Sequence, residues 1–188
     1  INKKNTIDVV VGGPPCQAYS LSGKRHIDDP RANLFLEYFR AIEVMRPQIF
    51  VYENVKGLFS YKKGNIFHQL QEIFENIGYD LSINLVNALN YGIPQSRERI
   101  FIIGYKKGLN YSFPKHSHAN KAIRKPLTIS DAISDLPIIK NNENSVKYSS
   151  KPKTNYQKIM RKNAPDILMD HKSSKHSESL VNIMSYLP

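Results

Sequence analysis

Ile7-Asp8-Val9-Val10-Val11-Gly12-Gly13-Pro14-Pro15-Cys16-Gln17 joins an apolar run to a turn rich in glycine and proline. Its first half is apolar and rich in β-branched residues, which predicts a short buried strand. The glycines and prolines that follow end the strand and hold the next residue in a fixed loop. That residue is the single cysteine of the chain. A thiol at the carboxyl end of a strand stands where α/β proteins present a nucleophile, although a lone cysteine is more often a small buried apolar residue.

The residues that follow alternate between helix and strand patterns. Apolar residues at helical spacing indicate two helices, the second closed by Gly78, and short apolar runs indicate further strands. The expected helices span 34–45 and 66–77, and the expected strands span 49–52, 81–89 and 99–104. This order predicts an α/β fold with a hairpin-like last pair of strands. The first two strands are expected side by side, which places Cys16 and Glu53 at the same edge of the sheet.

From about Phe113 onward the chain is rich in Lys, Ser, Asn and Pro. We therefore expect an α/β part over residues 1–112 and a basic, irregular extension over residues 113–188. The elements expected in the extension are helices at 128–136, with Ser130 as the N-cap, and at 177–186, separated by a loop or disordered stretch at 141–153.

The charge of the chain points to an anionic partner. Its 27 lysines and arginines exceed its 16 acidic residues by 11, which favours nucleic acid, with lysines that merely keep the protein soluble as the alternative. A single cysteine excludes an internal disulfide framework and indicates a reducing, cytosolic setting. No apolar run has the length of a membrane span, and no signal peptide is visible. His171 and His176 have no cysteine partners, so we expect no metal site.

Three short motifs stand in order along the chain: Gly13-Pro14-Pro15-Cys16-Gln17, Glu53-Asn54-Val55 and Gln95-Ser96-Arg97-Glu98-Arg99. Together they resemble the motifs of the C5-cytosine methyltransferases that act on DNA. The connecting stretches 29–35 and 90–95 also fit. The resemblance runs from about Asp8 to Gly104, and continues more weakly through 126–137. Each motif alone is weak, whereas three in this order and in these structural settings are specific.

The resemblance implies a Rossmann-like methyltransferase sheet that uses S-adenosylmethionine, and it assigns catalytic roles. Cys16 would add to carbon 6 of cytosine, so that carbon 5 becomes enamine-like and accepts a methyl group. Glu53 would donate to N3 and accept from the exocyclic amine of the base. Arg97 would donate to O2, and Arg99 would help to anchor the same group. Taken singly, these three would be ordinary charges at a strand end or on a solvated strand face.

The resemblance also implies how DNA and cofactor would be held. The target cytosine would be flipped out of the duplex, and the loop from Gln17 to Asn33 would close over the DNA with Gln17 near the vacated space. Ser20, Ser22, Lys24 and Arg25 are candidates for phosphate contacts, with plain loop charges as the alternative. Pro14, Pro15 and Leu34 are the expected contributors to the cofactor pocket.

Other parts of the family pattern are expected outside this chain. The glycine-rich turn of the cofactor site and the acidic residue that binds the ribose would precede Ile1, and the target-recognition region would follow Pro188. Without the first strands, the strand at 7–11 would have an open edge, which would pair with another copy or be covered by the basic tail. We therefore expect the isolated chain to bind S-adenosylmethionine weakly or not at all, and not to methylate DNA.

The leading hypothesis is the catalytic part of a bacterial DNA methyltransferase of a restriction-modification system, cytoplasmic and associated with the nucleoid. A tRNA cytosine-5 methyltransferase shares these motifs, but the sequence after Phe113 is more similar to the bacterial DNA enzymes. A non-catalytic nucleic-acid-binding module is the alternative from another class. Such a module has no need of Cys16, Glu53, Arg97 and Arg99 together.

Overall fold

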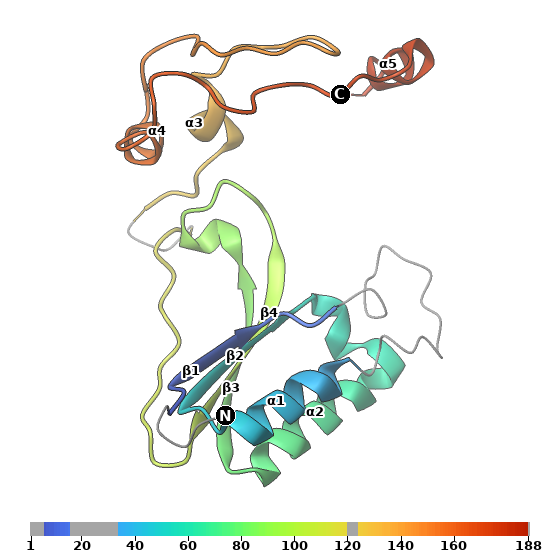
Figure 1. Cartoon of the computed structure of the whole chain (residues 1–188), viewed down its shortest axis with the longest axis vertical. Coiled ribbons are helices and arrows are strands. Elements are labelled where there is room, and N and C mark those ends of the chain that lie inside the picture. The colour runs from blue at the N-terminus through green and yellow to red at the C-terminus, as the bar shows by residue number, and fades with distance from the viewer. Residues whose placement is uncertain (1–5, 16–33, 120–123, 188) are drawn as a thin grey trace. The chain divides into compact units, whose positions relative to one another are not determined.

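A computed structural model describes residues 6–15, 34–119 and 124–187 (Figure 1). The chain divides into two compact units, which are described separately below. The first unit comprises Ile1–Gly92 with Ser96–Lys125, and the second comprises Ile93–Gln95 with Pro126–Pro188. The functional boundary expected near residue 112 stays a prediction.

The first unit contains a mixed four-stranded sheet in the order β1-β2-β4-β3 (Figure 1). The strands are β1 (Val9–Gly12), β2 (Ile49–Asn54), β3 (Tyr79–Asn87) and β4 (Glu98–Lys106). β1 and β2 are parallel, whereas β4 is antiparallel to both of its neighbours. The expected α/β fold, the adjacency of the first two strands and the hairpin-like last pair are therefore confirmed.

Two helices cover one face of this sheet and lie side by side (Figure 1). They are α1 (Phe35–Met45) and α2 (Asn65–Asn76). Short 3-10 turns at Lys56–Phe59 and Tyr61–Gly64 connect β2 to α2, and another at Ala88–Tyr91 follows β3. Alternate residues of β2 are buried under them, as the period of a strand requires. Phe50 of β2 packs on Phe74 of α2 with ring centroids 4.3 Å apart, and Tyr79 completes this aromatic core.

The opposite face of the sheet is more open. β1 lies at one edge of the sheet that the described residues form, and Val9 and Val11 are 52% and 72% exposed. The register sets Val11 beside Val51, two residues before Glu53, so these side chains share one face. Glu53 thus belongs to the open face rather than to the helix-covered core. No helix in the described part of the chain is both long and apolar enough to cross a membrane.

The second unit contains α3 (Ile129–Ile133), α4 (Asn155–Met160) and α5 (Glu178–Met184). Thr128, not the expected Ser130, is the N-cap of α3, because Asp131 returns a bond to Thr128 and completes a capping box. α4 was not predicted, although the Thr154–Gln157 capping box was its signal. The expected loop at 141–153 is irregular apart from a single bridge from Asn144 to Lys172.

Candidate active site at the carboxyl ends of β1 and β2

An ion pair between Glu53 and Arg99 forms the centre of the site. Glu53 lies opposite Phe101 in the antiparallel pairing of β2 with β4, so Arg99, two residues away, is its diagonal neighbour on the same face. Arg99 Nε donates to Glu53 Oε1 at 3.0 Å. The two side chains are 23% and 35% exposed respectively, so the pair is half-buried but still open to a ligand.

Gly13 lies against the other oxygen of the same carboxylate. A Cβ atom placed on Gly13 would be 3.1 Å from Glu53 Oε2, which is closer than most Cβ contacts in proteins. Arg99 therefore fixes one oxygen of the carboxyl group, and the missing side chain of Gly13 leaves room for the other. Cys16 follows Gly13 by three residues in the sequence.

Asn54 ties this loop to β2, a role that was not predicted from the sequence. Its side chain is buried, and its Nδ2 donates to the carbonyl of Pro14 at 3.3 Å and to the hydroxyl of Tyr52 at 3.1 Å. Its Oδ1 accepts from the backbone N–H of Val55 at 2.9 Å. The signal was the asparagine within Glu53-Asn54-Val55, but its bond to Pro14 depends on the parallel pairing of β1 with β2.

Tyr38 of α1 is a second positioning residue that was not predicted. Its hydroxyl donates to the carbonyl of Val51 at 2.8 Å and lies 3.5 Å from that of Val10. Burial raises the pKa of Tyr38 far above its ordinary value, so the phenol stays a donor. The ring also occupies the space that a Cβ on Gly12 would need. Gly12 therefore lets α1 press close to β1, and Tyr38 fastens β1 beside β2.

The side chain of Arg97, which was expected to be catalytic, does not contact the Glu53–Arg99 ion pair. It is exposed, and within the described residues only its backbone forms hydrogen bonds. Its N–H donates to Asn87 Oδ1 at 3.2 Å, and its carbonyl accepts from the N–H of Ala88 at 3.0 Å. The backbone of Arg97 is thus fixed, while its guanidinium is available to a ligand. Beside it, Lys56 pairs with Glu98 at 3.0 Å.

Pro14, Pro15 and Leu34, the residues expected to contact S-adenosylmethionine, suit only part of that molecule. Pro14 is half-buried, whereas Pro15 and Leu34, at the start of α1, are exposed. Their apolar surfaces suit the less polar portions of S-adenosylmethionine. None of the three has a polar side chain that could bind a ribose hydroxyl or an α-amino acid group.

Several expected site residues lie outside the described residues: Cys16, Gln17, Ser20, Ser22, Lys24 and Arg25. The two histidines considered for metal are described. His171 Nε2 lies 2.9 Å from the carbonyl of Pro137, and the backbone N–H of His176 donates to Asn141 Oδ1 at 2.9 Å. Among the described residues there is no cluster of three His, Cys, Asp or Glu side chains that could hold a metal ion.

The chain is similar in sequence to the members of one protein family. The family described as C-5 cytosine-specific DNA methylase matches residues 1–185. The Type II methyltransferase M.AgeI of Thalassovita gelatinovora is 36% identical over 90% of this chain and 44% of its own length. M.DdeI of Desulfomicrobium norvegicum is 37% identical over 94% of this chain and 44% of its own length. The chain therefore spans less than half the length of these curated relatives.

A solved structure gives the same result. A prophage-encoded protein of E. coli, described as a DNA modification methyltransferase, superimposes with a TM-score of 0.71 at 25% identity. The match covers 98% of this chain and 57% of that one. The family match, the relatives and this superposition all include the strands that carry Glu53 and Arg99, and the chain belongs to the C-5 cytosine-specific DNA methylases.

Proposed function

We propose that this chain supplies the catalytic part of a DNA cytosine-5 methyltransferase, within a polypeptide of its relatives' length. One observation carries the proposal. Arg99 fixes the Glu53 carboxyl at the carboxyl end of β2, beside Gly13 of the loop that leads to Cys16, in a chain that the family matches over residues 1–185. The family membership supports the reaction, and the fixed carboxyl supports the position of the base.

In the proposed reaction the Cys16 thiolate adds to carbon 6 of cytosine, and the electrons of the 5,6 double bond move into the ring. For this step the Glu53 carboxyl is protonated: it donates its proton to N3, where the addition places negative charge, and it accepts a hydrogen bond from the exocyclic amine. Arg99 keeps the carboxyl in place, and the exposed Arg97 guanidinium donates to O2 of the base. S-adenosylmethionine supplies an electrophilic methyl group for carbon 5. A base, for which water suffices, then removes the carbon 5 proton, and the bond between sulfur and carbon 6 breaks to release the thiolate.

The reaction requires a cytosine outside the double helix, so we propose base flipping. Gln17 would lie near the vacated space, and Ser20, Ser22, Lys24 and Arg25 would bind the flanking phosphates. The relatives named as Type II methyltransferases support a bacterial restriction-modification role in the cytoplasm, on nucleoid DNA.

Methyl transfer tests this function directly. The full-length protein, incubated with duplex DNA and S-adenosylmethionine labelled in the methyl group, should place the label on carbon 5 of cytosine. Cys16→Ser should abolish the transfer, because a hydroxyl is far less ionised than a thiol at neutral pH. Transfer to tRNA but not to DNA would replace the DNA assignment. DNA binding without any transfer would favour a non-catalytic module.

The isolated chain should bind the cofactor poorly. The contacts expected from Pro14, Pro15 and Leu34 are apolar and include no side-chain hydrogen bond, so little affinity is available to offset the entropy lost on binding. Isothermal titration of residues 1–188 with S-adenosylmethionine should therefore show no binding in the micromolar range. Micromolar affinity, or methylation of DNA by the isolated chain, would contradict this expectation.

A further inference from the structure

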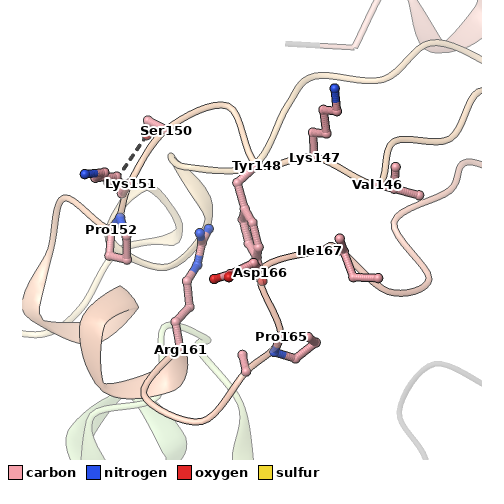
Figure 2. A pocket seen from close by; sticks show the side chains of 11 residues that line it. Val146, Lys147, Tyr148, Ser150, Lys151, Pro152, Arg161, Pro165, Asp166 and Ile167 are labelled. Carbon is pink, nitrogen blue, oxygen red and sulfur yellow. Dashed lines mark hydrogen bonds between the residues drawn. The ribbon is translucent and has the colours of Figure 1, made fainter.

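The second unit contains a surface pocket that the candidate active site does not use (Figure 2). Its volume is about 660 Å³, and it is bordered by the stretches 146–152 and 161–167. The ring of Tyr148 and the side chains of Pro165 and Ile167 give it an apolar wall. Lys147 and Lys151 stand at its rim, with their ammonium groups directed away from the Tyr148 ring (Figure 2). The pocket therefore combines an apolar wall with the charged side chains of Arg161 and Asp166, and two lysines stand at its rim.

The sequence around this pocket is strongly basic. Residues 147–162 include no Asp or Glu, and their charged residues are Lys147, Lys151, Lys153, Lys158, Arg161 and Lys162. All five lysines are exposed, and none has an ion-pair partner within the part of the chain that the structure describes. Of the described residues that line the pocket, Asp166 alone is acidic. The surface thus carries an unneutralised excess of positive charge.

Arg161 differs from the five lysines because its charge is paired within the protein, where it stabilises the fold. Its guanidinium lies 3.3 Å from the centroid of the Tyr148 ring, and its Nη2 pairs with the buried Asp135 carboxylate. Next to Tyr148, Ser149 donates from its N–H and its Oγ to the carbonyl of Asp135 at 3.0 and 2.8 Å. The loop that carries Lys147 is thereby fixed to the residues that follow α3.

The other end of the loop is fixed as well. Gln157, which is fully buried, accepts from the N–H of Lys153 at 2.7 Å and donates to Ser134 Oγ at 3.0 Å. The loop from 147 to 153, called the basic loop below, is therefore held at both ends by buried groups. Three lysines on such a framework bind a polyanion with less loss of backbone entropy than three lysines on a mobile tail.

We propose that the basic loop binds the phosphodiester backbone of DNA, through residues that the candidate active site does not include. The proposal rests on the proposed function, which makes DNA the substrate. Lys147, Lys151 and Lys153 would each neutralise a phosphate as a compact point charge. The apolar wall beside them suits the deoxyribose. Contacts of this kind add affinity without reading sequence.

The salt dependence of DNA binding tests this surface. In the full-length protein, Lys147→Gln, Lys151→Gln and Lys153→Gln are combined, and binding to a duplex is measured by fluorescence anisotropy at several salt concentrations. Each lost phosphate contact lowers the slope of log affinity against log salt by about 0.9, so the slope should fall by about 2 to 3. Affinity near 0.1 M salt should fall roughly ten-fold or more, equally for duplexes of different sequence. The matched control combines Lys140→Gln, Lys172→Gln and Lys175→Gln, which remove the same charge from the same unit.

The outcomes separate this proposal from the proposed function. Wild-type protein that methylates DNA, together with a basic-loop variant whose slope is unchanged, would overturn the contact surface alone. An equal loss in the control variant would also overturn it, because charge anywhere in the unit would then explain the effect. Preferential loss of binding to an RNA duplex would replace DNA with RNA as the partner. Absence of methyl transfer by the wild-type protein would instead contradict the proposed function.

Discussion

Glu53 has two neighbours of opposite kinds: a charged arginine, Arg99, and a glycine without a side chain, Gly13. Arg99 is a charged donor that fixes one oxygen at 3.0 Å, whereas Gly13, which has no side chain, leaves room for the other oxygen. A carboxyl group that must meet two atoms of one base needs its orientation fixed before the base arrives. The glycine is therefore as much a part of the site as the arginine.

Gly13→Ala tests whether the carboxyl needs this room. The added methyl group would be 3.1 Å from Glu53 Oε2, so either the carboxyl or the loop must move by a few tenths of an ångström. In the full-length protein we expect kcat for methyl transfer to fall roughly ten-fold or more, with little change in the KM for DNA. The urea midpoint of unfolding serves as the control and should change little. Unchanged kcat in a folded variant would show that Gly13 does not position the acid.

At the element scale, Tyr38 on α1 connects the helix to the two strands that lead to the site. We expect Tyr38→Phe to lower the free energy of unfolding by about 1 kcal/mol, because it removes the hydrogen bond to Val51 and leaves a carbonyl less well satisfied. Urea denaturation measures this. Tyr105→Phe is a matched control, since within the described residues its hydroxyl forms no hydrogen bond. Equal losses in both variants would contradict the role of Tyr38.

The strands and helices of the first unit were predictable, because apolar periodicity and turn residues determine them locally. The ion pair of Glu53 with Arg99 was not predicted, since Arg99 was expected only to help anchor the base. Its diagonal geometry depends on the antiparallel register of β2 with β4, and no local pattern specifies that register. The roles of Asn54 and Tyr38 were missed for the same reason. Each bonds to backbone carbonyls of a neighbouring element, and a sequence does not show which carbonyl will be within reach.

At the scale of the whole molecule, the edge of β1 deserves a test of its own. Val9 and Val11 are exposed on this edge strand, and a strand edge with unpaired backbone groups tends to pair with another chain. We expect the 188-residue chain to self-associate in sedimentation velocity experiments at micromolar concentration. Val9→Lys combined with Val11→Lys should shift it toward monomer. A monomer whose β1 amides exchange rapidly with solvent would contradict this expectation. A monomer with protected β1 amides would show that the chain covers the edge itself.

The proposed function depends on a covalent bond between Cys16 and cytosine, formed with the support of Glu53 and Arg99. The most direct measurement is trapping of the full-length protein on a duplex that contains 5-fluorocytosine in place of cytosine, in the presence of S-adenosylmethionine. With fluorine on carbon 5 there is no proton for the base to remove, so the elimination that releases the thiolate is blocked. The bond between sulfur and carbon 6 should therefore persist through denaturing electrophoresis. We predict an adduct with wild-type protein that peptide mass spectrometry maps to Cys16, and no adduct with Cys16→Ser. An adduct that forms equally well with Cys16→Ser, or none with wild-type protein that methylates the unmodified duplex, would contradict the account.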